Sequence, residues 1–185
     1  WRQVVELKKV KPVVVSMGNV AASGGYYISC AANKIIAEPN TLTGSIGIFG
    51  MFPNASGLFG KLALTTDIVK TNTFSDLGDL SRPMTESEKA LIQGYVERGY
   101  QTFLSRCAEG RGMTTEAVNA IGQGRVWTGE QAKERGLVDE LGGIELAIST
   151  AAGLADLDQY SVTTVSGSKN FLDEFLESQL GEVKL

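Results

Sequence analysis

Short apolar runs alternate with longer amphipathic segments along the chain. The runs at 13–17 and 34–37 are rich in β-branched residues and contain no regular polar positions, which is typical of strands buried on both faces of a parallel sheet. Helical spacing of apolar residues follows several of these runs. The alternation predicts an α/β fold with a largely parallel sheet. Strands are predicted at 13–17, 34–37, 64–69, 126–127 and 160–165, with a further candidate at 45–49.

The clearest predicted helix begins at Thr85–Glu88, which has the sequence of a capping box, and ends near Gly110. Its apolar positions fall on one face. That face carries Leu91, Tyr95, Gly99, Phe103 and Cys107. Further helices are predicted at 1–9, 23–32, 114–121, 128–136, 144–152 and 171–180. Residues 72–81 are polar and expected to be exposed. Residues 1–185 are interpreted as a single domain, in which 151–185 add a strand and a terminal amphipathic helix.

Charges are nearly absent from one long segment of the chain. Pro12–Gly60 contains only Lys34 and Glu38, where the chain average predicts about ten charged residues. Repeated Gly, Asn and Ser residues interrupt the apolar runs, so the segment cannot supply the ~20 apolar residues of a membrane span. It is interpreted as the buried centre of the domain. Trp1–Lys11 is charged and lacks the apolar core of a signal peptide, and the absence of an initial Met indicates a piece of a longer protein.

The composition excludes several kinds of site. The 185 residues contain no histidine, which within this chain excludes Ser–His–Asp and Cys–His arrangements and His-ligated metal sites. Cys30 and Cys107 are too few for a disulfide framework and are expected to be small buried thiols. The net charge of −4 argues against a nucleic-acid-binding surface. No cofactor is expected.

The candidate chemistry lies directly after the first predicted strand. That strand leads through small residues to Ser23, at the start of a predicted helix, and Gly24 follows. The N–H groups of a helix N-terminus can stabilise an oxyanion, and Gly24 would let a scissile carbonyl approach its backbone. The pattern is close to the nucleophile motif G-x-S-x-G, although Ala21 replaces the first glycine. Spacing alone leaves open the alternative that Ser23 is an N-cap beside packing glycines.

A serine nucleophile needs a general base, and without histidine the remaining candidate is a lysine whose pKa is lowered by burial. Lys34 follows Ser23 by eleven residues, which is ~16 Å along a continuous helix and too far for a hydrogen bond. Sequence distance leaves Lys61 and Lys70 as candidates, and a surface position is the simpler interpretation of each.

Two blocks of sequence resemble the signal peptide peptidase A (protease IV) family of bacterial serine peptidases. The first is 13–50, with Ala21–Tyr27 and Leu42–Gly47 as its most specific parts. The second combines Val126–Ala132 with Gly136–Gly143. The resemblance covers about residues 1–150 and implies a Clp-protease/crotonase-like fold built from repeated β-β-α units.

The resemblance also implies roles for individual residues. Ser23 would be the nucleophile of a Ser–Lys dyad, the Gly24 N–H an oxyanion donor, and Ser45 the side chain that orients the lysine. Ser75 stands where the short form of the family carries that lysine. The chain therefore resembles the carboxy-terminal half of the long, two-domain form, in which the amino-terminal half supplies the lysine. The family's Ser-Pro-Gly-Gly segment, which supplies a second oxyanion donor, is absent from these residues, so we expect the chain alone to be inactive.

The implied substrates are signal peptides or other apolar, extended peptides, with residues such as Ile48 and Phe49 in apolar pockets or in packing contacts. The implied setting is a homo-oligomer at the bacterial cytoplasmic membrane, with the active site on the extracytoplasmic side. Tyr95, Gly99 and Phe103, together with Ile46–Leu58, are expected to form the surface of self-association. Two alternatives stay open: a crotonase-type acyl-CoA enzyme and a non-catalytic oligomerisation domain.

Overall fold

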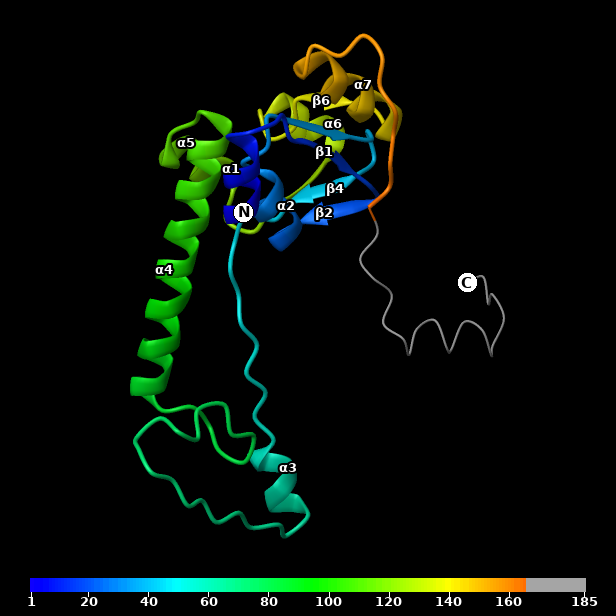
Figure 1. The fold of residues 1–185 in the computed structure, drawn as a ribbon. Coiled ribbons are helices and arrows are strands. Elements are labelled where there is room, and N and C mark those ends of the chain that lie inside the picture. Colours follow the sequence, from blue (N-terminus) through cyan, green and yellow to red (C-terminus); the bar gives the residue numbers. More distant parts are fainter. Residues whose placement is uncertain (166–185) are drawn as a thin grey trace, which may run out of the picture.

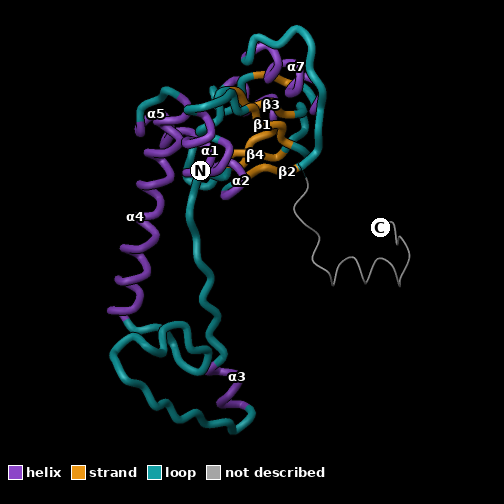
Figure 2. The backbone as a smooth tube through the Cα atoms, in the orientation of Figure 1, coloured by secondary structure: helices purple, strands orange, loops and turns teal. Residues whose placement is uncertain are grey.

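The structure, a computed structural model, describes residues 1–165, and its strands form two three-stranded sheets (Figures 1 and 2). One sheet has the order β1-β3-β6, with β1 at Val14–Met17, β3 at Lys34–Ala37 and β6 at Glu140–Leu141. The other has the order β2-β4-β5, with β2 at Val20–Ala22, β4 at Leu42–Gly44 and β5 at Val126–Thr128. Strands pair in parallel everywhere except between β4 and β5.

From β1 to β4, consecutive strands enter different sheets, which produces a β-β-α repeat. β1 and β2 are followed by helix α2, and β3 and β4 repeat the step one strand further along each sheet. The predicted α/β class with largely parallel pairing is confirmed. The helices are α1 (Arg2–Lys8), α2 (Gly24–Ser29), α3 (Ser56–Lys61), α4 (Glu86–Arg111), α5 (Thr115–Ile121), α6 (Gly129–Glu134) and α7 (Ile144–Leu154).

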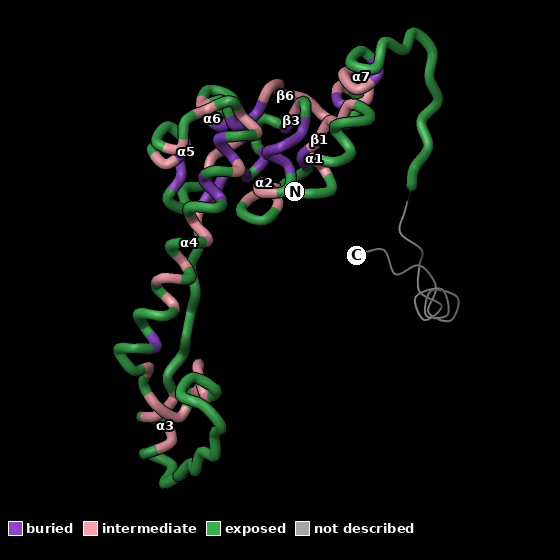
Figure 3. Tube along the Cα trace, turned by 60° about the vertical axis from the view of Figure 1, so that its left-hand side comes forward, coloured by how far each residue is buried: buried purple, intermediate pink, exposed green. Residues whose placement is uncertain are grey.

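Buried residues concentrate around the two sheets (Figure 3). We call the part of the molecule that contains both sheets the body. Tyr26 of α2 is fully buried there, and its hydroxyl donates to the Leu137 carbonyl at 3.0 Å. Residues 50–85, with α3, and the first half of α4 extend away from the body and are mostly exposed (Figures 1 and 3). We call this extension the arm.

An ion-pair network fixes the arm where α4 begins. The predicted capping box is present, with the Glu88 N–H bonded to the Thr85 hydroxyl and the Thr85 N–H bonded to the Glu88 carboxylate. Arg82 donates to both carboxylate oxygens of Glu88, at 2.6 and 2.8 Å, and to Asp76 at 2.8 Å. The Arg82 guanidinium lowers the pKa of buried Glu88 to about 2, so this carboxylate stays charged at neutral pH.

Several predicted elements are wrong in position or extent. Residues 45–49, 64–69 and 160–165 form no strand. The segment at 64–69 lies exposed in the arm, where no neighbouring strand supplies the ladder that a strand needs. The helix expected at 23–32 ends at Ser29. β2, β4, β6 and α3 were not predicted, and the helix predicted at 171–180 lies outside the described residues.

The close contact of α4 with the end of α2 depends on a glycine. A Cβ atom at Gly110 would overlap the carbonyl oxygen of Cys30, which is backbone and cannot rotate away. Cys30 and Cys107 are both fully buried beside this contact, as predicted. Phe103, one helical turn before Cys107, packs edge-on against Tyr27 with ring centroids 5.0 Å apart. The second half of α4 therefore belongs to the core of the body.

We expect Gly110→Ala to lower the free energy of unfolding by about 1–3 kcal/mol, because the added methyl must displace backbone in a packed interface. Gly94→Ala, on the same helix, is the matched control. There the nearest atom is the flexible end of Arg98, at 3.2 Å, and alanine should stabilise the helix by about 0.5–1 kcal/mol. Thermal or denaturant unfolding measures both. Equal effects of the two substitutions would contradict the close contact between α4 and α2.

Candidate active site

Ser23 occupies the junction between β2 and α2, at the N-cap of the helix, and it is exposed. Its backbone has φ 52° and ψ −114°, a strained conformation for a residue with a side chain. The Ser23 N–H donates to the Gly44 carbonyl at 2.9 Å, and the Ser23 carbonyl accepts from the Tyr27 N–H at 2.8 Å. The side chain makes no cap hydrogen bond. The alternative that Ser23 serves as a side-chain N-cap is therefore wrong.

Ser23 and Ser45 line the same cavity, which has a volume of about 470 Å³. The prediction that Ser23 lies at a helix N-terminus beside a cavity is thus confirmed. Gly24 follows in the first turn of α2, and its Cα faces open space, with no atom within 4 Å of the position that a Cβ would take. The remaining lining residues are Gly47, Ile48, Phe49, Gln93, Val96, Glu97, Tyr100, Gln123 and Gly124.

The wall that carries Ser45 is held by backbone hydrogen bonds beyond the end of β4. Ser45 has φ 48° and directly follows Gly44, whose φ of 76° also lies in the left-handed region. The Ser45 N–H donates to the Arg125 carbonyl at 2.7 Å, and the Gly124 N–H donates to the Ile46 carbonyl at 2.8 Å. The segment after β4 thereby continues the antiparallel contact with the chain before β5, although it does not form the strand predicted at 45–49.

The opposite wall comes from α4, which the sequence analysis did not place at the site. Gln93, Val96, Glu97 and Tyr100 have the i, i+3, i+4, i+7 spacing of one helix face. The Tyr100 hydroxyl donates to the Asn119 side chain at 2.8 Å and accepts from a backbone N–H at 2.9 Å. Gln93 donates to the Glu97 carboxylate at 2.8 Å. The helical spacing was visible in the sequence, but its orientation toward Ser23 was not.

Among residues 1–165, no lysine lines this cavity. Lys34 pairs with Asp139 at 3.6 Å. Lys61 ends α3 in the arm, well away from α2 (Figure 1), and Lys70 pairs with Asp76 at 3.0 Å in the same arm. Ser75, at the position where the resemblance expects a lysine, is exposed and bonded to the backbone of Asn72. None of the sequence-based lysine candidates is therefore brought to Ser23.

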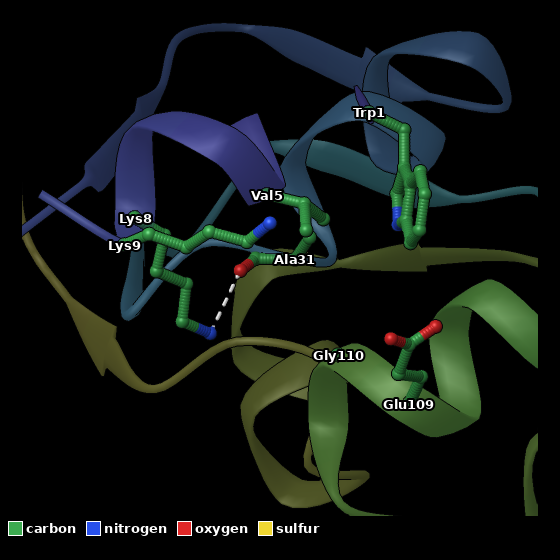
Figure 4. A pocket seen from close by; sticks show the side chains of 7 residues that line it. All are labelled: Trp1, Val5, Lys8, Lys9, Ala31, Glu109 and Gly110. Carbon is green, nitrogen blue, oxygen red and sulfur yellow. Dashed lines mark hydrogen bonds between the residues drawn. The ribbon is translucent and has the colours of Figure 1, made fainter. Parts of the chain in front are cut away.

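A second cavity, of about 270 Å³, lies where α1 and the end of α4 meet (Figure 4). It is lined by Trp1, Lys8 and Glu109 among others, and the Lys8 ammonium donates to the Ala31 carbonyl at 2.9 Å. It contains none of the predicted site residues. Within the described part of the chain, no three His, Cys, Asp or Glu side chains are grouped so that they could hold a metal ion. No helix of residues 1–165 has both the length and the apolar content that crossing a bilayer requires.

Comparisons with known proteins give matches over most of this chain. The family model described as "Peptidase family S49" matches residues 5–158. Protease 4 of Salmonella typhi is 41% identical over 174 residues, covering 94% of this chain and 28% of that protein. Serine protease SPPA, chloroplastic, of Arabidopsis thaliana is 39% identical over 158 residues (85% and 23%), and Protease 4 of Haemophilus influenzae is 42% identical over 154 residues (83% and 25%).

The chain therefore spans about a quarter of the length of these relatives. Among solved structures, an enoyl-CoA hydratase from Polaromonas sp. JS666 is similar with 16% sequence identity and a TM-score of 0.33. That similarity covers 79% of this chain and 39% of the hydratase chain.

The positive φ of Ser23 predicts that any side chain at this position lowers the stability of the fold. Ser23→Gly and Ser23→Ala both remove the hydroxyl, but only glycine adopts positive φ without a Cβ penalty. We expect Ser23→Gly to be more stable than Ser23→Ala by about 1 kcal/mol. Denaturant unfolding of the two variants under identical conditions measures the difference. A glycine variant no more stable than the alanine variant would show that the conformation stores no strain.

Proposed function

The chain belongs to peptidase family S49, a family of serine proteases, and from this premise we propose that Ser23 is the nucleophile of a Ser–Lys dyad. The observation that supports this role most directly is the placement of its side chain. Ser23 is exposed, lines a cavity and makes no cap hydrogen bond, so its hydroxyl is available to a substrate. The strained turn from β2 into α2 is the setting in which nucleophilic serines occur in other hydrolases.

The proposed reaction is acyl transfer through a covalent ester. Ser23 Oγ attacks the scissile carbonyl carbon while a lysine amine removes the hydroxyl proton, and the same proton then goes to the leaving amine. Water hydrolyses the resulting ester and restores the serine. The Gly24 N–H is proposed as one donor to the oxyanion, since it lies in a first helical turn that has no intrahelical acceptor for it. Ser45, which lines the same cavity, would orient the lysine amine.

We infer that the lysine comes from outside these 185 residues, from the amino-terminal half of a longer parent protein. Two observations support this. No lysine in the described part of the chain lines the cavity, and Lys34 and Lys70 are engaged in ion pairs. The three relatives named above are about four times as long as the matched region, so a protein of that length has room for a second, lysine-bearing half.

The proposed substrates are apolar, extended peptides such as released signal peptides. Ile48, Phe49 and Val96 give the cavity apolar surface next to Ser23, which suits such side chains. The remaining part of this proposal rests on the family resemblance: the enzyme would act at the bacterial cytoplasmic membrane, with its active site on the extracytoplasmic side.

We expect the purified 185-residue chain to fold but to show no turnover of a peptide ester and no labelling by a fluorophosphonate. Loss of general-base assistance typically costs ~10²–10⁴ in rate, and loss of an oxyanion donor a further ~10²–10³. The full-length parent protein should be labelled at Ser23, and Ser23→Ala should abolish labelling and proteolysis. Ser23-dependent turnover by the chain alone would contradict the external lysine. Acyl-CoA turnover by the parent without labelling of Ser23 would favour a crotonase-type enzyme.

We also propose that the chain associates with copies of itself through the arm. Its side chains include large apolar groups in solvent: Met51 is 82% exposed, Val69 97% and Tyr95 71%. The surface differs from the helix face expected from sequence. Phe103 is in the core. Gly99 packs against Ile48, whose Cδ1 atom lies 2.5 Å from the position that a Cβ on Gly99 would take. Large apolar side chains exposed in this way are typical of an interaction site.

Sedimentation of the chain at high protein concentration tests this proposal. We expect oligomers for the unmodified chain and a shift toward monomer for Val69→Glu combined with Met51→Glu, because charges would be buried at the interface. Glu130→Gln, at an exposed position of α6 in the body, should leave the distribution unchanged. A strict monomer at high concentration would contradict self-association. A Ser23→Ala parent that assembles and retains full proteolysis would instead favour a non-catalytic oligomerisation domain.

A further inference from the structure

The cavity beside Ser23 is lined by apolar side chains, several neutral polar ones and one charged side chain. Ile48 and Phe49 cover one side of it and Val96 the other, and Glu97 is the single charged residue among its lining side chains in the described chain. Glu97 and Val96 both line this cavity from α4, so the cavity presents a carboxylate as well as apolar surface. A peptide-binding cavity for purely apolar side chains gains nothing from a carboxylate at this position, because an unpaired charge next to bound apolar groups must be desolvated.

The hydrogen bonds of Glu97 leave part of its carboxylate available. One oxygen accepts from the Gln93 amide at 2.8 Å, and within residues 1–165 no lysine or arginine forms an ion pair with Glu97. Arg98 lies back along α4, over Gly94. Arg125 donates instead to the Ala120 carbonyl and to the Gln123 side chain. Within residues 1–165, Glu97 thus has an amide on one carboxylate oxygen and no cation paired with it.

We propose that Glu97 is a specificity-determining residue that selects a lysine or arginine side chain in the peptide substrate. This inference rests on the proposed function, since Ser23 is what makes the cavity a peptide site. Lysine and arginine carry an apolar stem that can pack against Ile48, Phe49 and Val96 while the cationic head reaches the carboxylate. Phe49, whose ring is almost fully exposed, offers the same cation a π-face. The preferred substrate is therefore apolar along most of its length but basic at one position.

The effect should be moderate, because Glu97 is exposed and solvent screens the pair. An exposed ion pair typically changes an equilibrium by up to about fivefold, and we expect a difference in kcat/KM of that size. The difference should shrink as salt is raised, since screening acts on the charge and not on the packing of the stem.

The experiment uses the full-length parent protein and pairs of fluorogenic peptides that differ at a single position, lysine against norleucine. The two side chains share the same stem and differ in the charged head. Moving the pair along the peptide locates the position that faces Glu97. At that position we expect the unmodified enzyme to prefer lysine by about fivefold in kcat/KM, Glu97→Gln to lower kcat/KM for the lysine peptide relative to the norleucine peptide until the preference is lost, and Glu97→Lys to favour glutamate over lysine.

Glu109→Gln is the matched control, because it removes the same charge from the same helix, about 18 Å along its axis. It should retain the lysine preference. Two results would overturn the inference: no preference at any position in the unmodified enzyme, or an equal loss for lysine and norleucine in Glu97→Gln. Labelling of Ser23 by a fluorophosphonate separates these results from failure of the proposed function. A labelled enzyme without a charge preference contradicts only the role of Glu97, whereas an unlabelled one contradicts the role of Ser23.

Discussion

The hydrogen bond from the Ser23 N–H to the Gly44 carbonyl, 2.9 Å long, fixes the backbone on which the candidate site depends. The ladder between β2 and β4 ends with the pair Ala22 and Gly44, and this bond extends it by one residue. Ser23 therefore enters α2 with positive φ, and its side chain does not fold back onto the first helical turn. The next residue on the partner strand, Ser45, is fixed in the same way by the Arg125 carbonyl. The two serines come to the same cavity because the Ser23 N–H is bonded to Gly44, the residue directly before Ser45.

The strands that could be predicted from the sequence are those whose apolar, β-branched composition by itself indicates burial. The β-branched runs that became β1 and β3 need only to be apolar to be recognised, and β3 lies at the centre of its sheet with β1 beside it. β2 and β4 consist of three residues each, with small or polar side chains, and they are strands because each has a partner. Leu64–Val69 shows the converse case. Its composition favours a strand, but it lies in the arm without a partner, and local propensity cannot form a ladder alone.

The candidate site divides along the same line. Ser23 and Gly24 were identifiable because their signal is local: a buried strand, a small-residue turn and a helix start within eleven residues. Ser45 was chosen through family resemblance, and the wall formed by α4 was not found at all. Predicting that wall requires knowledge of which face of the long helix α4 is turned toward the cavity. The helix face predicted from Leu91 to Cys107 describes the core contact correctly only from Gly99 onward. Before that point the helix leaves the body. The residues of α4 that line the cavity belong to a different helix face, which carries Gln93, Val96, Glu97 and Tyr100.

Helix α4 thus joins two parts of the molecule with different physical requirements. Its second half is fixed by packing, with Gly110 against the Cys30 carbonyl and Phe103 against Tyr27. Its first turn is fixed by charge, through Glu88 and Arg82. The cavity lies between these anchors, where α4 leaves the body, and Tyr100 ties that stretch to the body through two hydrogen bonds. The nucleophile wall is held by backbone pairing and the facing wall by side chains, so residues of the facing wall can differ between related proteins without moving Ser23. The candidate nucleophile can therefore be predicted from a short stretch of sequence. The residues that would recognise a substrate cannot, because their position depends on contacts between segments that are far apart in the sequence.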